Sequence, residues 1–356
     1  MIERPSLTEQ TGSRPAVPLG ITMGCPAGIG PEIIVKLFEK HTDFLHYPPA
    51  AVLGDMNILR KASQAAGTGI RLREWRPGAP LQPGVINVCP VTELDISAVR
   101  WGRASPVTGR ASFLYIEQGI KYSMNGSLSG IVTAPVSKTG LRLAGIDYPG
   151  HTEIFADHTG CSRYAMMMAG DKLRVVLVTI HLPIRDVPGR ISLENIRRTI
   201  EITASALKWD FCIPAPSIAV AGLNPHGGEG GMFGTEEADI IAPAIEEVRR
   251  SGVDASGPFP PDTVFYQAAA GRFDAVICQY HDQGLIPFKL LHFKDGVNVT
   301  IGLPLVRTSV DHGTAYDIAG QGTADCSSLE AALILAGRIV DNRRHLANSD
   351  TMEAVH

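Results

Sequence analysis

Three histidines follow apolar, β-prone runs and are the residues of this chain best suited to hold a metal. They are His181 after residues 174–180, His226 after residues 217–223, and His281 after residues 276–280. Ligands of open α/β sheets lie at the carboxyl ends of the strands. Three neutral imidazoles leave a divalent ion with open positions for substrate oxygens, as in a Lewis-acid site. The pattern therefore predicts a metal site, with unrelated loop histidines as the alternative.

A second group of polar residues suits a substrate that carries phosphate or carboxylate. The group is His151, Thr152, Lys289, Asn298 and Arg307. An arginine binds such oxyanions bidentately, and a His-Thr pair can donate to a phosphate or act as an acid. A metal that polarises a carbonyl, together with a group that moves a proton, is what a β-keto acid needs to lose carbon dioxide. Considered alone, His151 is more often a structural hydrogen-bonder.

Two acids and a glycine-rich loop have more than one interpretation. Asp282 is placed to orient the imidazole of His281, whereas Asp262 at a helix start is more often an N-cap than a catalytic acid. The loop 24–30 would turn backbone N–H groups and a helix start toward an anion, or would simply form a tight turn. Its spacing matches neither the dinucleotide fingerprint nor the P-loop.

Strand and helix signals alternate along the chain and predict an α/β scaffold. Strands are expected at 19–23, 51–55, 128–133, 164–168, 173–180, 217–223, 276–280 and 296–302. Helices are expected at 31–40, 56–66, 108–124 and 192–208, from Thr235, before Ala270, and from Ser327, where Glu330 completes a capping box. The segment 148–153, with His151, is expected to be a loop. At 356 residues the chain fits one large unit or two lobes with a cleft between them.

The composition excludes several classes of protein. The formal net charge is only −4 and no basic block is present, so nucleic acid is not expected as a partner. No run approaches the roughly 20 apolar residues of a membrane span. Residues 1–17 lack the apolar core of a signal peptide, which predicts a disordered tail. Six cysteines without a CxxC pair argue against a disulfide framework and favour a cytoplasmic protein.

Six ordered segments resemble signatures of the 4-hydroxythreonine-4-phosphate dehydrogenase family. They are 24–32 (GCPAGIGPE), 133–138 (TAPVSK), 150–153 (GHTE), 224–226 (NPH), 280–284 (YHDQG) and 311–315 (DHGTA), and the likeness runs from about Pro18 to Gly337. It implies a two-lobed α/β fold similar to isocitrate and isopropylmalate dehydrogenases, with a mixed central sheet flanked by helices and an active-site cleft between the lobes. It also implies NAD-dependent, divalent-metal-dependent oxidation of 4-phosphohydroxy-L-threonine to a β-keto acid. Decarboxylation to 3-amino-2-oxopropyl phosphate would follow, in pyridoxal 5′-phosphate biosynthesis.

The resemblance further implies roles for individual residues. His181, His226 and His281 fall on ligands of a divalent metal, which is zinc or alternatively magnesium, manganese or cobalt. His281 would come from the second subunit of a homodimer with a shared active site. His151, Thr152, Lys289, Asn298 and Arg307 fall on positions that contact the small phosphorylated hydroxy-acid substrate. Asp262, Lys289 and His151 fall where proton transfer is expected.

The segment 312–320 resembles the adenosine-binding loop of isopropylmalate and isocitrate dehydrogenases. The resemblance assigns NAD binding to His312, Gly313, Thr314, Ala315, Asp317 and Asp325. An Asp at the position of Asp317 accepts from ribose hydroxyls and repels a 2′-phosphate, which implies NAD rather than NADP. Lobe 1, with the NAD-binding loops, is expected at 18–145 plus 284–356. Lobe 2, with the metal ligands, substrate contacts and dimer contacts, is expected at 146–283.

One departure from the family pattern lies in the loop 24–30. The family sequence there is usually Gly-Asp/Glu-Pro-Ala-Gly, and Cys25 replaces its carboxylate. Related enzymes of the same fold oxidise 4-phospho-D-threonate, 4-phospho-D-erythronate or carboxylated cis-dihydrodiols with the same metal and NAD chemistry, so these are alternative substrates. A zinc hydrolase or aldolase without a redox step, and a metal- or nucleotide-binding module without turnover, are the rival classes.

Overall fold

A single mixed sheet of 12 strands runs through the whole molecule. The computed structural model describes residues 17–41 and 47–353, so residues 1–16 of the expected tail lie outside the described residues. The strand order is β3-β4-β2-β1-β5-β12-β11-β6-β7-β10-β8-β9. Helices lie between most successive strands, and the prediction of an α/β fold with a mixed central sheet is confirmed.

The elements have the following bounds. The strands are β1 Leu19–Thr22, β2 Ala50–Asp55, β3 Arg71–Glu74, β4 Val85–Thr92, β5 Ile131–Thr133, β6 Ala165–Ala169, β7 Arg174–Leu177, β8 Ile218–Ala221, β9 Ala255–Phe259, β10 Ala275–Cys278, β11 Val297–Ile301 and β12 Arg307–Val310. The helices are α1 Gly30–Lys40, α2 Met56–Ala65, α3 Pro106–Met124, α4 Lys138–Leu143, α5 His151–Thr159, α6 Leu193–Trp209, α7 Ala242–Arg250, α8 Pro261–Ala269, α9 His281–Leu291 and α10 Ser327–Glu353. Short helical turns are η1 Ile96–Ala98, η2 Ile184–Asp186, η3 Pro225–Gly231 and the π-helical η4 Glu237–Ile241.

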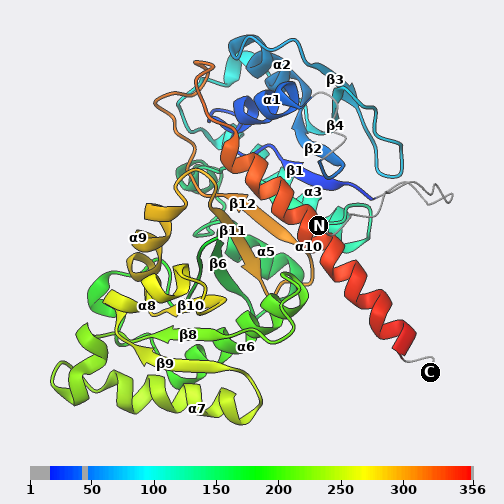
Figure 1. Cartoon of the computed structure of the whole chain (residues 1–356). Coiled ribbons are helices and arrows are strands. Elements are labelled where there is room, and N and C mark those ends of the chain that lie inside the picture. The colour runs from blue at the N-terminus through cyan, green and yellow to red at the C-terminus, as the bar shows by residue number, and fades with distance from the viewer. Residues whose placement is uncertain (1–16, 42–46, 354–356) are drawn as a thin grey trace.

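Two mostly parallel groups of strands meet at an antiparallel centre. β11 pairs antiparallel with both β12 and β6, and these strands join the upper and lower parts of the molecule (Figure 1). Parallel strands are covered on both faces and therefore read as continuous apolar runs, as every residue of β1 and β2 is buried. The expected lobe boundary at 283/284 falls inside α9, and the division into two lobes stays a prediction.

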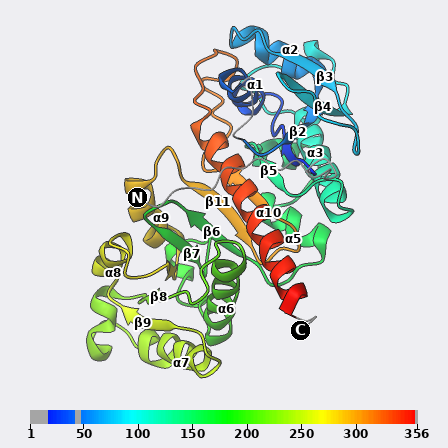
Figure 2. The same ribbon diagram turned by 45° about the vertical axis from the view of Figure 1, so that its right-hand side comes forward.

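Helix α10 crosses the junction between the two parts (Figure 2). The expected apolar face of this helix is buried, namely Leu329, Ala332, Leu333, Ala336, Ile339 and Val340. The expected capping box is wrong, because the Glu330 carboxylate accepts from Lys40 at 2.7 Å and from Tyr47 at 2.6 Å instead. Asp325 instead satisfies a backbone N–H at the start of the helix, since its carboxylate accepts from the Ser327 N–H at 2.9 Å.

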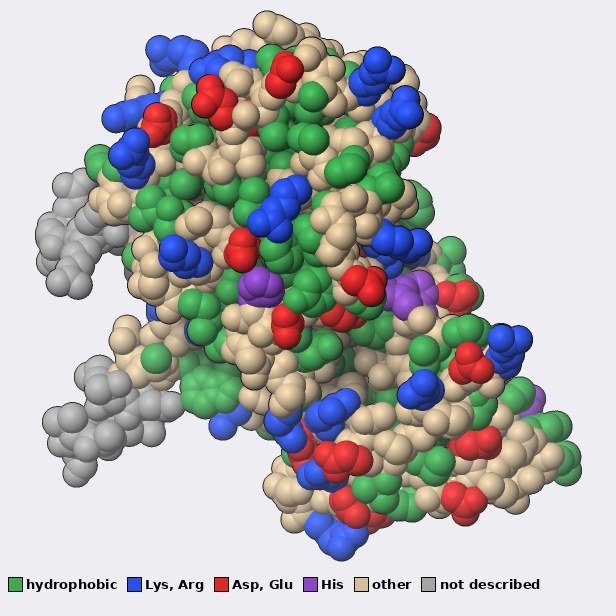
Figure 3. Space-filling view, turned by 180° about the vertical axis from the view of Figure 1, so that it is seen from behind, with side chains coloured by type: hydrophobic (Ala, Val, Ile, Leu, Met, Phe, Trp, Pro, Cys, Tyr) green, Lys and Arg blue, Asp and Glu red, His purple; other side chains and the backbone are tan. Residues whose placement is uncertain are grey.

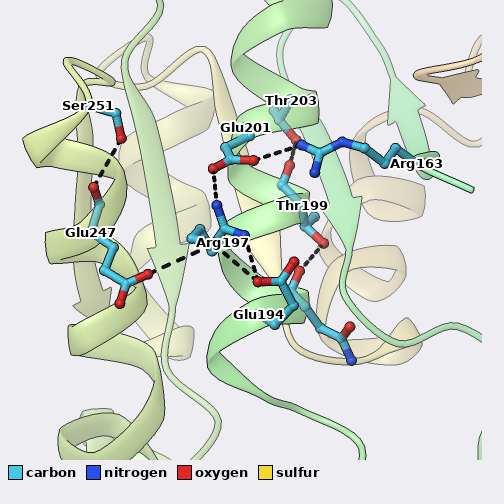
Figure 4. A network of polar contacts seen from close by, with 9 residues as sticks. Arg163, Glu194, Arg197, Thr199, Glu201, Thr203, Glu247 and Ser251 are labelled. Carbon is cyan, nitrogen blue, oxygen red and sulfur yellow. Dashed lines mark hydrogen bonds and ion pairs between the residues drawn. The ribbon is translucent and has the colours of Figure 1, made fainter.

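Charged side chains on α6 and α7 form a network of ion pairs outside the cleft. Arg197 on α6 contacts Glu194, Glu201 and Glu247, and so ties α6 to α7 (Figure 4). On the rear face, side chains of both signs are spread among apolar and polar ones (Figure 3). Within residues 17–41 and 47–353, no helix combines the length and the hydropathy needed to cross a bilayer.

Two helices that carry site residues were not predicted. His151 begins α5 rather than lying in a loop, and His281 begins α9 rather than ending a strand. The helix α9 contains Gly284 and Pro287, two residues that are unfavourable inside a helix, so the local sequence does not predict it. Its buried Phe288 packs into the core, which shows that tertiary burial overrides the local preference.

Candidate active site

A cleft of about 460 Å³ gathers most of the predicted site residues. All five predicted substrate-binding residues line it: His151, Thr152, Lys289, Asn298 and Arg307. His181 and His281 lie in the same cleft, as do His312 and Gly313. These residues come from α5, α9, β11, β12 and the segments after β7 and β12, so the cleft lies across the antiparallel centre of the sheet.

Arg307 is a buried cation without a carboxylate partner. Arg307 is only 2% exposed. Its Nη1 donates to Thr300 Oγ1 at 2.9 Å and its Nη2 donates to Thr133 Oγ1 at 2.8 Å. The guanidinium lies 5.6 Å from the ring centre of Phe155, and its Nε is buried without a hydrogen-bond partner. Burial lowers the pKa of Arg307 to about 9, and the charge of Glu153 opposes that shift, so the group stays charged at neutral pH. A buried charge of this kind is costly unless an anion joins it.

His151 and Asn298 bring further unsatisfied polar atoms to Arg307. His151 Nε2 and Asn298 Oδ1 are both buried without a partner. Burial lowers the pKa of His151 well below its usual range, and the positive charge of Arg307 adds to this, so the ring is neutral. Thr152 is buried beside it in the first turn of α5, where free backbone N–H groups favour anions. Buried polar groups are nearly always hydrogen-bonded. Arg307 Nε, and His151 Nε2 if it carries the proton, are donors that suit an oxyanion, whereas the acceptor Asn298 Oδ1 suits a hydroxyl or ammonium group of the same ligand.

Lys289 and Asp311 form an ion pair in the same cleft. Lys289 Nζ lies 3.0 Å from Asp311 Oδ2 and donates to the Asp311 backbone carbonyl at 3.3 Å. Burial raises the pKa of the Asp311 carboxyl, whereas the hydrogen bond from Lys289 opposes that shift. The pair is therefore able to hold a proton close to the bound ligand.

His181 and His281 follow neighbouring parallel strands, β7 and β10, and their ring centres are 5.7 Å apart. Asp282 Oδ1 lies 2.7 Å from His281 Nδ1, which fixes the ring and leaves Nε2 for a ligand. Burial lowers the pKa of His181, and the charges of Lys138 and His281 add to the effect. A neutral His181 is the form that binds a metal.

His226 lies apart from this pair, although β8 is the neighbour of β10. Beyond β8 the chain turns away, because Glu237 accepts the backbone N–H groups of Leu223 at 2.8 Å and Asn224 at 2.7 Å. His226 itself has a left-handed φ of 54° and faces Phe233, with ring centres 6.5 Å apart. In the part of the chain that the structure describes, no three His, Cys, Asp or Glu side chains gather as a metal site. Within one chain, His281 thus lies beside His181 and His226 lies apart, and the sharing of the three ligands between two subunits stays a prediction.

Asp262 also lies outside the cleft of its own chain. It is exposed in the first turn of α8, and it makes no helix cap, contrary to the structural interpretation. Helix α8 packs against η3, the segment of His226, and Gly227 approaches Pro260. The predicted site residues thus form two groups: a cleft group, and an outer group of His226 and Asp262.

The expected NAD-binding segment follows β12 and packs on the glycine-rich loop. Thr314 accepts the backbone N–H of Ile29 at 3.1 Å, and a side chain at Gly28 would meet Thr314. The N–H groups of Cys25, Gly28 and Ile29 go to backbone carbonyls, which favours the tight turn over an anion site. Cys25 Sγ lies 3.3 Å from the Tyr316 hydroxyl. The exposed Asp317 is open to a ligand, whereas the Asp325 carboxylate is already bonded to Ser327.

Sequence patterns missed three further cleft residues, namely Glu153, Ser309 and Asp311. Ser309 lies on β12 beside Val310, and Asp311 comes directly after that strand. The rule that identified the histidines, a polar residue at the end of a strand, would have found Asp311. Glu153 lacked a signal because α5 was not predicted.

Comparisons with known proteins agree on one family. Residues 46–336 match the family described as pyridoxal phosphate biosynthetic protein PdxA. The chain is 52% identical over 328 residues to the 4-hydroxythreonine-4-phosphate dehydrogenase of Desulforapulum autotrophicum, covering 92% of this chain and 96% of that one. The crystal structure of a 4-hydroxythreonine-4-phosphate dehydrogenase from Klebsiella pneumoniae is 41% identical with a TM-score of 0.83, covering 91% and 100%. A terephthalate 1,2-cis-dihydrodiol dehydrogenase from Burkholderia xenovorans LB400 is 28% identical with a TM-score of 0.62, covering 90% and 98%.

Proposed function

Because the chain belongs to the pyridoxal phosphate biosynthetic protein PdxA family, we propose how its cleft carries out the family's reaction. The chain is a 4-hydroxythreonine-4-phosphate dehydrogenase, an oxidoreductase of pyridoxal phosphate biosynthesis. The proposed reaction takes 4-phosphohydroxy-L-threonine and NAD to a β-keto acid and NADH, after which the acid loses carbon dioxide to give 3-amino-2-oxopropyl phosphate. The observation that carries the substrate assignment is the buried Arg307 with no acidic partner, beside the unpartnered atoms of His151 and Asn298.

The phosphate of the substrate binds at Arg307, His151, Thr152 and Asn298 in this proposal. Arg307 supplies the charge, and the first turn of α5 supplies backbone N–H groups. His151 acts as a neutral donor rather than as an acid, because its pKa lies well below the usual range. Binding then satisfies polar atoms that the free protein leaves unpaired, which favours an oxyanion over an apolar ligand.

A divalent metal fits the histidines of two chains. His181 and His281 of one protomer are neighbours with Nε2 of His281 free, and the third ligand is His226 of the partner subunit. A divalent ion held by these histidines would supply Lewis-acid chemistry, drawing electron density from the substrate oxygen and so easing decarboxylation. Lys289, paired with Asp311, is positioned to return a proton to the carbon that loses carbon dioxide.

An exposed apolar surface supports a homodimer. On α9, Ile286 and Leu290 are 68% and 85% exposed and lie one turn apart on one face, and Phe293, just beyond the helix end, is 78% exposed. Helix α8, with the 81% exposed Tyr266, lies beside α9 at the same edge in both views (Figures 1 and 2). Contiguous apolar surface of this kind marks protein interfaces. A dimer through this face would bring the outer group of His226 and Asp262 toward the partner's cleft.

NAD binds in this proposal along residues 312–317. Asp317 is exposed and accepts from the ribose hydroxyls, whereas Asp325 serves mainly to start α10. A carboxylate at Asp317 would repel the 2′-phosphate of NADP. The six cysteines are free, which fits the proposed cytoplasmic location.

A substrate screen for NADH formation tests the proposed function. The enzyme is stripped with a chelator, reloaded with zinc, magnesium, manganese or cobalt, and assayed with 4-phosphohydroxy-L-threonine, 4-phospho-D-threonate, 4-phospho-D-erythronate and a carboxylated cis-diol. We expect metal-dependent NADH formation with the first compound at the highest kcat/KM. A higher kcat/KM with any other compound would reassign the substrate, and no NADH with any of them would favour a reaction without a redox step.

A further inference from the structure

A second cavity, of about 320 Å³, lies at the amino ends of β7 and β11 and the carboxyl end of β6, away from the histidine pair. It is bounded by the turn between β6 and β7, the end of α6, the start of β11 and one face of α10. Helix α10 packs along β11 in this region (Figure 2). Its size is within the range of small-molecule sites, roughly 300–1,000 Å³. Nothing in the proposed reaction uses this cavity.

Arg174 brings an unpaired cation to the cavity. Its Nη1 donates to the Asp274 backbone carbonyl at 3.2 Å, and its guanidinium lies 4.9 Å from the ring centre of Phe211. Its Nε is buried without a partner. Among the described residues, no carboxylate lies within ion-pair distance of this side chain. An arginine with free donors in a cavity is suited to a carboxylate.

Arg338 on α10 is a second free cation in the lining. Its neighbours on the helix are paired, Arg343 with Asp210 at 2.6 Å and Arg344 with Asp341 at 4.0 Å. No ion pair or hydrogen bond of Arg338 is found in the described part of the chain. Arg174 and Arg338 therefore line the same cavity, and neither has an ion pair among the described residues.

The rest of the lining limits the kind of ligand. Val297, Ile334 and Leu335 give the cavity an apolar wall. Three acids line the same cavity. Asp210 is paired with Arg343 and Asp295 lies 3.1 Å from His292 Nδ1, whereas Asp171 is exposed and has no ion pair among the described residues, so the free arginines meet a nearly balanced set of acids. A multiply charged anion would meet these acids, whereas a ligand with one negative and one positive group would find a partner for each.

We propose that this cavity binds a small zwitterion of the α-amino-acid class. Its carboxylate pairs with Arg174 and Arg338, its apolar side chain lies against Ile334 and Leu335, and its ammonium faces Asp171 and Asp295. The site is separate from the dehydrogenase cleft, and its existence does not depend on the proposed function.

Isothermal titration calorimetry of the full-length protein with three matched probes tests this assignment. The probes are L-leucine, 4-methylpentanoate, which lacks the ammonium, and 3-methylbutylamine, which lacks the carboxylate. We expect saturable binding of L-leucine and roughly tenfold or weaker binding of each of the others, because each loses a charge-assisted pair. No saturable binding of L-leucine, or equal binding of 4-methylpentanoate, overturns the proposal.

Three variants locate the binding. Arg338→Gln should weaken L-leucine binding roughly tenfold or more. Arg344→Gln, six residues further along α10 and outside the cavity lining, should leave it unchanged. Arg307→Met removes the cation of the cleft and should also leave L-leucine binding unchanged. Equal effects of Arg338→Gln and Arg344→Gln, or loss of binding in Arg307→Met, contradict a site at this cavity.

Discussion

Arg197, in the ion-pair network of α6 and α7, and Arg307, in the cleft, have opposite surroundings. Arg197, 31% exposed, is surrounded by Glu194 at 2.6 Å, Glu201 at 2.8 Å and Glu247 at 3.8 Å (Figure 4). Arg307, which is fully buried, has only the hydroxyls of Thr300 and Thr133. Exposed networks contribute little to stability, and an unpaired buried charge lowers it. Arg197 is neutralised by its own neighbours, whereas Arg307 has no acidic partner, which is the arrangement expected of a residue that binds an anionic ligand.

The largest effect is expected when the cleft loses its cation. Arg307→Met should lower kcat/KM for the phosphorylated substrate by roughly two to three orders of magnitude, because a buried charged contact is worth about 2–5 kcal/mol. The KM for NAD should change much less. Steady-state kinetics on both substrates measure the two effects, and an equal rise in both KM values would contradict phosphate binding by Arg307.

The same variant should stabilise the free protein. Arg307→Met removes a desolvated charge that has no acidic partner, so the melting temperature without ligand should rise. Wild-type protein should gain more stability from inorganic phosphate than the variant does. Thermal unfolding with and without phosphate gives both numbers. A lower melting temperature in the variant would mean that Arg307 is a structural residue.

An intermediate effect is expected on the pH dependence of stability. Burial holds the pKa of His151 well below that of the unfolded chain, so below about pH 6.5 only the unfolded state takes up this proton. Acidification should therefore favour unfolding, by up to about 1.4 kcal/mol per pH unit. His151→Gln should flatten this slope in denaturant titrations between pH 7.5 and 5. Identical slopes would show that His151 is protonated alike in both states.

A smaller effect is expected at the contact between the glycine-rich loop and residues 312–317, the proposed NAD segment. Cys25→Ala removes the 3.3 Å contact with the Tyr316 hydroxyl and should raise the KM for NAD roughly threefold to tenfold. Cys89→Ala is the matched control, because Cys89 is also buried but lies in a different core cluster. A rise in the KM for the phosphorylated substrate alone would contradict a role of Cys25 in holding the NAD segment.

The smallest effect is expected when Arg197, in the surface network of α6 and α7, is replaced. Arg197→Gln should leave kcat/KM unchanged and cost at most about 1 kcal/mol of unfolding free energy, since exposed pairs are weak. The cost should shrink further in high salt. A change in kcat comparable with that of Arg307→Met would remove the distinction between the two regions.

The sequence predicted the sheet and most of the cleft for a physical reason. Apolar runs identified buried strands, and the carboxyl ends of the neighbouring parallel strands β7 and β10 bring His181 and His281 together in one chain. The resemblance had instead assigned His281 to the second subunit. Arg307 and Asn298 were placed in the cleft by the motifs of the resemblance. The starts of α5 and α9 were not predicted. In α9, Gly284 and Pro287 lower the local helix preference, and tertiary packing rather than that preference stabilises the helix.

The position of His226 could not be predicted from strand patterns. It depends on Glu237, 11 residues later in the chain, whose carboxylate holds residues 223 and 224. Asp262 lies outside the cleft because α8 packs against η3, and Asp325 is engaged by Ser327. These are contacts between side chains and backbone that leave no periodic signal in the sequence.

Complementation between histidine variants tests most directly that the metal site is shared between subunits. Mixed dimers of His226→Ala and His281→Ala should contain one intact site, so a random mixture should recover about a quarter of wild-type activity. His181→Ala mixed with His281→Ala should recover none, because those two residues belong to one chain's cleft and both sites are damaged. Recovery in the second mixture but not in the first would contradict the account.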